Sequence, residues 1–291
     1  MRTRLALTGA TGNVGRRILD GLAAGGSRDL VAISRSTSRA VGVGAATVQR
    51  KVADYADRAA LTVALDGVET LIFIASDDEA SSMLVHHLNV IDAAAAARVG
   101  HVVYLSSLDA DPGSPFCYAG VHAETERRIA RSGIAFSIAR VSLYGEFFAQ
   151  WPLAAIGTGE LRLPAADGAI SLISRNDVAD CLIALADQPA SGSVALLTGG
   201  QAYDLDGVTE LTAQCSETSI RAIDLSPAEY RMQVVRDGVS PWWAYAFGTM
   251  FAAIREQRFS EVTDKVAGLL GRPPTPFRNV LEGLLPSSHR Q

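Results

Sequence analysis

Three glycines near the N-terminus constrain this chain more than any other feature. Gly9, Gly12 and Gly15 follow the short apolar run Leu5–Leu7, and apolar residues at helical spacing begin at Ile18. A strand, a glycine-rich turn and a helix start, in that order, form the layout that binds the phosphates of a dinucleotide. The first glycine permits a tight exit from the strand, the second lets the backbone approach the pyrophosphate, and the third lets the helix pack closely on the sheet. The sequence therefore predicts a dinucleotide site in this turn.

The end of the next apolar segment carries information on which dinucleotide binds. An NAD-binding unit usually has an acidic residue there, about twenty residues after the glycines, to hold the ribose 2′-OH. This chain ends the segment 30–35 in Ser34 and Arg35, and the carboxylate of Asp29 lies at the wrong end. Arg35 is placed to meet a 2′-phosphate, with Arg39 assisting, because a guanidinium pairs bidentately with phosphate oxygens. We expect a preference for NADPH over NADH, and the alternative is that Arg35 is a solvated loop charge.

Strand-like and helix-like patterns alternate through the first half of the chain, which is typical of parallel strands joined by crossover helices. The run Leu71–Ala75 is continuously apolar, as expected of a central strand covered on both faces. The predicted strands cover residues 4–8, 30–34, 47–52, 70–75, 101–106 and 134–139, and the predicted helices lie near 13–24, 57–65, 81–99 and 120–132. We predict an α/β fold, a Rossmann-type doubly wound parallel sheet with a smaller, mainly helical C-terminal subdomain.

The second half of the chain is less regular. Helical patterns lie near 174–185, 205–217, 227–236 and 241–257, and one strand pattern lies at 194–198. We predict an NAD(P)-binding domain over residues 1–150 and a substrate-side subdomain over 151–291, with some strands returning to the main sheet.

Composition excludes several classes of function. The chain of 291 residues is 48% hydrophobic and 20% charged, as a folded globule requires, and its net charge of −5 gives no reason to expect a nucleic acid partner. No apolar stretch is long enough to span a bilayer, and a strand begins almost at once, so we expect a cytoplasmic protein without a signal peptide. Cys117, Cys181 and Cys215 show no metal-ligand spacing and are expected to be reduced thiols.

Several motifs spread along the chain resemble one family. They are Thr8–Gly15, Val52–Asp57, Val103–Ser107, His122–Glu126, Ser132–Ile134 and Ile173–Val178. Together they resemble the NmrA-like atypical short-chain dehydrogenase/reductases, and within that group the NAD(P)H:quinone oxidoreductases of type 2 and the triphenylmethane reductases. The most distinctive motif is His-x-Glu-Thr-Glu after a strand that ends in Ser-Ser. The resemblance implies an NADPH-dependent reductase with the nicotinamide above the carboxyl edge of the sheet.

The resemblance also implies cofactor contacts at matching positions. They are Gly9, Ala10, Thr11, Gly12, Asn13 and Val14 for the pyrophosphate, Arg35 for the 2′-phosphate, Ile74, Ala75 and Ser76 along the adenosine and ribose, and Val141, Ser142, Leu143 and Tyr144 near the nicotinamide. The last segment reads Arg-Val-Ser from Arg140, where the family more usually has Arg-Pro-Gly or Arg-Asn-Gly. This departure puts the geometry of the nicotinamide contacts in question.

A tyrosine and a histidine form the candidate catalytic pair. Classical short-chain dehydrogenases use a tyrosine and a lysine four residues later, which binds ribose and lowers the pKa of the tyrosine. Tyr118 and His122 keep this spacing with histidine in place of lysine. A histidine, with a reference pKa of about 6.5, is mostly neutral at pH 7 and would lower the pKa of the tyrosine much less. Alcohol oxidation is therefore disfavoured, whereas quinone reduction needs orientation, a hydrogen-bond donor and a proton. Tyr118 or His122 could donate, and the alternatives are a packed aromatic ring and a histidine at a helix start.

Three other features leave a functional and a structural alternative open. Ser106 and Ser107 either touch the cofactor or substrate or bond the local backbone. His86 and His87, in an apolar helix pattern, indicate packed or solvent-facing histidines, and no metal site is predicted. The aromatic groups Tyr144–Trp151 and Trp242–Phe247 either form a flat acceptor pocket or belong to the core of the C-terminal subdomain.

The sequence thus predicts an NADPH-dependent oxidoreductase that transfers hydride to a small-molecule acceptor, a quinone or aromatic dye or another planar conjugated compound. A homodimer is compatible with it. The alternative is a non-catalytic NAD(P)-sensing regulatory protein of NmrA type, which the missing lysine keeps open.

Overall fold

The chain divides into two compact units that interleave along the sequence. A computed structural model describes residues 4–24, 29–35, 48–76, 78–165 and 167–285. The first unit comprises Met1–Ser106, Val121–Arg140 and Val178–Ala195, and the second comprises Ser107–Gly120, Val141–Asp177 and Leu196–Gln291. The predicted single boundary near residue 150 stays a prediction.

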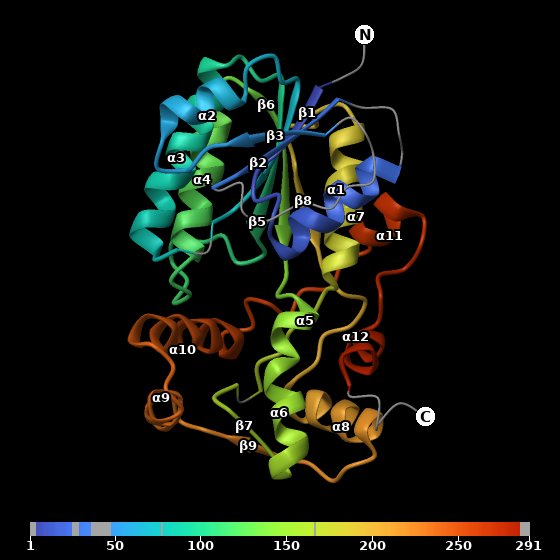
Figure 1. The fold of residues 1–291 in the computed structure, drawn as a ribbon. Coiled ribbons are helices and arrows are strands. Elements are labelled where there is room, and N and C mark those ends of the chain that lie inside the picture. The colour runs from blue at the N-terminus through green and yellow to red at the C-terminus, as the bar shows by residue number, and fades with distance from the viewer. Residues whose placement is uncertain (1–3, 25–28, 36–47, 77, 166, 286–291) are drawn as a thin grey trace. The chain divides into compact units, whose positions relative to one another are not determined.

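A seven-stranded sheet in the order β3-β2-β1-β4-β5-β6-β8 organises the fold (Figure 1). Its strands are β1 (Arg4–Leu7), β2 (Asp29–Ser34), β3 (Val48–Val52), β4 (Thr70–Ile74), β5 (His101–Ser107), β6 (Ala135–Val141) and β8 (Val194–Leu197). The pairs β1–β2, β1–β4, β2–β3 and β4–β5 are parallel. Central strands are covered on both faces, which explains why β4 reads as an uninterrupted apolar run. The predicted doubly wound sheet is confirmed, and each predicted strand lies within two residues of its observed bounds.

Helices cover both faces of the sheet in the first unit. Figure 1 shows α2 (Arg58–Ala64), α3 (Ala80–Ala96) and α4 (Ala119–Arg131) on one face, and α1 (Asn13–Ala24) and α7 (Arg175–Asp187) on the other. In α1 the buried residues recur at helical spacing and form the stripe that packs on the sheet. They are Val14, Gly15, Ile18, Leu19 and Leu22.

The second unit is mainly helical, as predicted. Its helices are α5 (Gly145–Phe148), α6 (Gln150–Thr158), α8 (Leu205–Ser216), α9 (Pro227–Arg236), α10 (Pro241–Arg255), α11 (Lys265–Leu270) and α12 (Phe277–Leu284). A two-stranded parallel sheet of β7 (Glu160–Leu163) and β9 (Arg221–Asp224), which the sequence did not predict, completes it. The start of α9 is fixed by a capping box, in which Ser226 and Glu229 each bond the backbone of the other, with Pro227 at the first helical position.

Candidate functional site

The candidate cofactor site lies at the point where the strand order reverses. Strand β1 pairs with β2 on one side and with β4 on the other, and both pairs are parallel. Open α/β sheets bind their ligands at the carboxyl ends of the strands on either side of such a switch point. Gly9 follows β1, Arg35 follows β2 and Ile74 ends β4. Three of the predicted cofactor segments therefore meet at one edge of the sheet in the first unit.

The turn after β1 is fixed to both neighbouring strands. The N–H of Ala10 donates to the Ile33 carbonyl at 3.4 Å, and the Thr8 hydroxyl accepts from the Ile74 N–H at 3.1 Å. Within the turn, the N–H of Gly12 donates to the Gly9 carbonyl at 2.9 Å. Gly9 has φ +62°, the left-handed region that glycine adopts without strain. The predicted task of Gly9, a tight exit from the strand, is what the backbone shows.

Gly15 has a different task from the one predicted. A Cβ at this position would lie 2.2 Å from the Gly9 carbonyl oxygen and 3.0 Å from the Cα of Ala10. The close approach that requires glycine is thus between α1 and the turn itself, rather than between α1 and the sheet. Gly15 thereby sets where the first N–H groups of α1 lie, and those groups have no partner within the helix.

We expected NADPH because the second strand ends in a basic residue and not in an acidic one, and the end of β2 has this arrangement. Asp29 begins the strand, where its carboxylate lies 3.4 Å from Nε of Arg4, and Ser34 ends it. Arg35 follows with an exposed side chain. A guanidinium, and no carboxylate, stands at the edge where the ribose 2′ position is expected. Arg39 lies outside the described residues.

The segment Ile74–Ser76, at the end of β4, is fixed by hydrogen bonds to its backbone, and it carries one buried hydroxyl without a hydrogen-bond partner among the described residues. The Tyr55 hydroxyl donates to the Ile74 carbonyl at 2.8 Å, and the Ser76 N–H donates to Nε2 of His87 at 3.2 Å. Ile74, Ala75 and Ser76 are half-buried. The Ser76 hydroxyl oxygen is buried and has no hydrogen-bond partner among the described residues. A buried hydroxyl normally has a partner, so this one fits a site that a ribose or phosphate hydroxyl would complete.

His122 lies in the first turn of α4 within a buried polar network of the first unit. Its Nδ1 is 2.8 Å from the hydroxyl of Tyr104, which is fully buried. Burial lowers the pKa of His122 to about 3, and the nearby Arg140 guanidinium acts in the same direction. His122 is therefore a neutral imidazole at physiological pH, which strengthens the prediction that it cannot replace a lysine as a cation.

Ser106, at the end of β5, is bonded to a side chain. Its hydroxyl donates to Oε1 of Glu126 at 2.6 Å, and Arg140 holds the same carboxylate with Nη2 at 2.7 Å from Oε2. This arrangement favours the structural alternative for Ser106, although its partner is a side chain and not the local backbone. In the sequence, Glu126 was noted only as the last residue of the His-x-Glu-Thr-Glu motif and Arg140 only as the start of Arg-Val-Ser, and neither was given a role.

The other histidines of the first unit have side-chain or backbone partners. His87 is fully buried and His86 contacts Asp78 at 3.1 Å. Over the described residues no group of three or more His, Cys, Asp or Glu could hold a metal ion. The cysteines are free thiols, and burial raises the pKa of Cys117, so its thiolate is disfavoured.

The remaining predicted site residues belong to the second unit. Val141 and Ser142 are buried, while Leu143 and Tyr144 are half-buried. The Ser142 N–H donates to the Leu197 carbonyl at 3.0 Å, and the Leu143 carbonyl accepts from Ile173 at 3.1 Å. Burial raises the pKa of Tyr144 to about 12, and the Arg175 guanidinium lies 5.4 Å from the centre of its ring. Tyr144 is thus fixed as a neutral aromatic ring.

The two aromatic groups divide between core and surface. Phe148 is buried, and Trp151 packs against Phe247 and Phe251 with ring centres 5.5 and 5.3 Å apart, so these rings form core. Trp243 and Tyr245 are instead 37% and 52% exposed.

The exposed rings continue to Tyr118. Trp242 contacts Tyr245 with ring centres 5.6 Å apart and Tyr118 with ring centres 6.2 Å apart. The acceptor-pocket alternative therefore narrows to Tyr118, Trp242 and Tyr245, called the aromatic face below. Trp243 instead packs against Phe247 with ring centres 5.7 Å apart.

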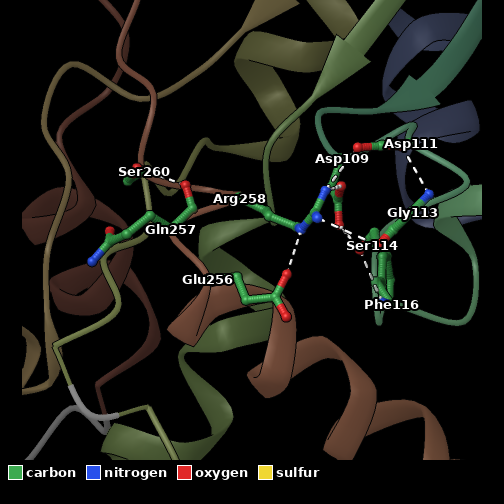
Figure 2. A network of polar contacts seen from close by, with 9 residues as sticks. All are labelled: Asp109, Asp111, Gly113, Ser114, Phe116, Glu256, Gln257, Arg258 and Ser260. Atoms are coloured by element: carbon green, nitrogen blue, oxygen red, sulfur yellow. Dashed lines mark hydrogen bonds and ion pairs between the residues drawn. The ribbon is translucent and has the colours of Figure 1, made fainter.

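The loop that leads to Tyr118 is fixed by one arginine (Figure 2). Arg258 donates to Asp111 at 2.9 Å and to Glu256 at 2.8 Å, and its Nη1 lies 3.6 Å from the buried carboxylate of Asp109. Asp109 in turn accepts from the Ser114 hydroxyl. Because Glu256 and Arg258 directly follow α10, one network fixes both this loop and the end of the helix that carries Trp242 and Tyr245.

A family model described as NAD(P)H-binding matches residues 9–189. The chain belongs to this NAD(P)H-binding family. The match begins at the glycine turn and spans Arg35, Ile74–Ser76, Tyr118, His122 and Val141–Tyr144.

Relatives define the group within the family. Quinone oxidoreductase 2 of Escherichia coli strain K12 is 32% identical over 93% of this chain and 95% of its own length. The crystal structure of the Escherichia coli NADPH-dependent quinone oxidoreductase complexed with NADPH has a TM-score of 0.90 at 30% identity, over 96% of this chain and 99% of that one. Triphenylmethane reductase of Citrobacter sp. complexed with NADP(H) has a TM-score of 0.89 at 25% identity, over 97% and 100%. The NAD(P)H-binding protein described here is thus an NAD(P)H-dependent oxidoreductase of the quinone oxidoreductase 2 and triphenylmethane reductase type.

Within the described residues, each helix is too short or too polar to cross a bilayer.

Proposed function

We propose that this oxidoreductase transfers hydride from NADPH to a planar conjugated acceptor, a quinone or an aromatic dye. The observation that carries the proposal is the burial of His122, whose Nδ1 lies 2.8 Å from the Tyr104 hydroxyl and whose ring is thereby kept neutral. A tyrosine that takes part in alcohol oxidation needs a neighbouring cation to lower its pKa, and an imidazole whose own pKa is about 3 supplies none at neutral pH. The site is suited to an acceptor whose reduction does not need a tyrosine with a lowered pKa.

Reduction of a quinone requires that the quinone be positioned against the cofactor, one hydrogen-bond donor and a proton. Hydride adds two electrons and one proton to the conjugated ring system, and the oxyanion that results takes up a second proton to give the hydroquinone. Such an anion is already stabilised by conjugation, so most of the rate comes from holding the reactants at short distance. Tyr118 and His122 are the proposed donors, and the aromatic face of Tyr118, Trp242 and Tyr245 has the flat apolar character that a quinone ring prefers.

The residues at the switch point fit the pyrophosphate and the adenosine half of an NADPH molecule. Gly9–Val14 would hold the pyrophosphate, Ile74–Ser76 the adenosine and ribose, and Val141–Tyr144 the nicotinamide. Arg35 would pair with the 2′-phosphate. When bound, the cofactor supplies the hydride.

Turnover with a panel of acceptors tests the activity. NADPH oxidation is followed with benzoquinones, naphthoquinones, triphenylmethane dyes and aldehydes, and the products are identified. We expect reduction of quinones or dyes and none of simple aldehydes. Tight binding of NADPH with no turnover of any acceptor would overturn the proposal in favour of a non-catalytic sensor of NmrA type.

Arg35→Ala tests the cofactor preference. Charge-assisted hydrogen bonds contribute about 1.5–3 kcal/mol each, so the dissociation constant of NADPH should rise at least tenfold while that of NADH stays within twofold. Arg131→Ala is the matched control, because it removes an exposed arginine of the same unit, at the end of α4. An unchanged ratio of the two dissociation constants in Arg35→Ala would refute the 2′-phosphate role.

A further inference from the structure

The hydrogen bonds around His122 determine which of its nitrogens carries the proton. We propose that Tyr104, held by His87 and Thr125, is a positioning residue that keeps His122 as the neutral tautomer protonated on Nε2, ready to donate to the oxygen of the acceptor. This inference rests on the proposed function for the role of His122, while the tautomer itself follows from the contacts alone.

The first step is the hydroxyl of Thr125. It donates to the Val121 carbonyl at 2.7 Å, one turn earlier in α4. A hydroxyl has one hydrogen to donate, so toward His87, whose Nδ1 lies 2.9 Å away, Thr125 can only accept. Nδ1 of His87 therefore carries a proton.

The second step reaches the same result from the other side of the ring. Nε2 of His87 faces the backbone N–H of Ser76 at 3.2 Å, and an N–H group can only donate. Nε2 of His87 must then be an acceptor, without a proton. Burial, together with the neighbouring His122, lowers the pKa of His87, so the ring stays neutral with its single proton on Nδ1.

The third step passes through Tyr104. Its hydroxyl oxygen lies 3.3 Å from Nδ1 of His87 and 2.8 Å from Nδ1 of His122. Nδ1 of His87 is itself a donor, so the one hydrogen of Tyr104 goes to another acceptor. The short 2.8 Å contact assigns it to Nδ1 of His122 rather than to Thr125, which also bonds Tyr104. Burial raises the pKa of Tyr104 well above its usual range, so this hydrogen is retained. Nδ1 of His122 is an acceptor, and the proton of the neutral ring is on Nε2.

As a consequence, His122 has one hydrogen-bond donor, Nε2–H, and its position on the ring is fixed. Among the described residues, Nδ1 is the only ring atom of His122 that has a hydrogen-bond partner. Nε2–H is left for a ligand, and it is the form that can stabilise a developing oxyanion as a neutral imidazole. The opposite tautomer would require Tyr104 to turn its hydrogen away from His122 and to accept from Nδ1 instead. The network also begins at Ser76, in the segment proposed to hold the ribose, so the donor and that segment share one set of hydrogen bonds.

Histidine ¹⁵N NMR on the full-length protein tests the tautomer directly. In the wild-type protein at pH 7, the ring nitrogens of His122 should show Nε2 protonated and Nδ1 unprotonated. In Tyr104→Phe the hydroxyl is lost, and the ratio of the two tautomers should shift toward Nδ1–H by about tenfold, the scale of one buried hydrogen bond. A wild-type His122 protonated on Nδ1, or a Tyr104→Phe protein with an unchanged ratio, would overturn the inference.

Two further variants control for folding and specificity. Thr125→Val removes one partner of His87 but leaves the Ser76 N–H on Nε2 of that ring, so it should keep Nε2 of His122 protonated, as in the wild-type protein. Tyr55→Phe removes another tyrosine hydroxyl of the first unit, the one bonded to Ile74, and should leave the tautomer of His122 as it is. A relaxed tautomer in Tyr55→Phe would show that the effect is not specific to Tyr104.

Kinetics separates the two proposals. Tyr104→Phe should lower kcat for quinone reduction about tenfold and leave the dissociation constant of NADPH within twofold. If NMR finds the Nε2–H tautomer but His122→Ala reduces quinones at the wild-type rate, the tautomer stands and the donor role of His122 in the proposed function is wrong.

Discussion

Gly15→Ala offers the sharpest test of how the turn binds its cofactor. The added Cβ would lie 2.2 Å from the Gly9 carbonyl oxygen and 2.9 Å from its carbonyl carbon. Close C···O contacts in proteins begin near about 3.3 Å, so either α1 or the turn must move by roughly 1 Å. Both neighbours are backbone, and no flexible side chain can absorb the shift.

The size of the effect follows from two opposing terms. Forcing an extra carbon into a packed position costs about 1–3 kcal/mol, and replacing glycine by alanine inside a helix returns up to about 1 kcal/mol. We expect a lower midpoint of thermal unfolding, by about 2–4 °C. A shift of about 1 Å also displaces the backbone N–H groups proposed to bind the pyrophosphate, so the dissociation constant of NADPH should rise about 10–100-fold.

Gly21→Ala is the matched control in the same helix. A Cβ at this exposed position would meet only the Cδ1 atom of Ile183, 2.9 Å away at the end of a flexible side chain. This variant should bind NADPH as the wild type does and unfold at the same or a slightly higher temperature. Calorimetric titration and thermal unfolding measure both quantities. A Gly15→Ala protein with wild-type affinity and stability would refute the reasoning, because it would mean that the turn yields without cost.

Three further predictions follow from the second unit and from His122. Arg258→Met leaves the buried Asp109 carboxylate without its cation and should destabilise the protein by about 3 kcal/mol in denaturant unfolding at pH 7. Burial already raises the pKa of Asp109. The loss should therefore shrink as the pH falls through the folded-state pKa of Asp109, since a protonated carboxyl needs no cation, and a loss that does not change with pH would assign it to packing instead. Phe148→Ala should lower the unfolding temperature, whereas Tyr245→Ala should raise KM for quinones at unchanged stability; the reverse pattern would make the aromatic face part of the core. Because the pKa of His122 is about 3, its ring does not titrate between pH 5 and 8, and quinone reduction should be flat over that range; a fall in rate as the pH rises through 6–7 would indicate a cationic histidine.

The first half of the fold could be predicted because its information is local. Helical and alternating patterns are complete within each segment, and the glycine turn identifies the first strand and helix together. The pairing of β7 with β9 was missed because Glu160–Leu163 and Arg221–Asp224 are four-residue segments far apart in sequence, and the polar–apolar alternation of Glu160–Leu163 is too short to identify a strand. Long-range pairing of this kind is decided by packing, which a single sequence does not display.

The candidate site likewise contains residues that could be predicted from the sequence and residues that could not. The positions of Gly9, Arg35 and Ile74 at one sheet edge follow from parallel strand order. The sequence pattern predicted Gly9 and Arg35 as cofactor residues, and the family resemblance added Ile74. The role of His87 could not be predicted, because its partners Ser76, Tyr104 and Thr125 come from three different elements. The sequence showed only a histidine in an apolar helix pattern, and its hydrogen bonds exist only after the chain has folded.

The interleaving of the two units also constrains how the protein can be made. The chain passes from one unit to the other after residues 106, 120, 140, 177 and 195. A fragment that stops at residue 150 lacks α7 and β8, so it would leave apolar surface of the sheet uncovered and one strand position empty. During synthesis the first unit cannot close until residue 195 has left the ribosome, by which time part of the second unit is already present. Neither unit can be exchanged by a single crossover between two genes, because each is assembled from separate segments of the chain.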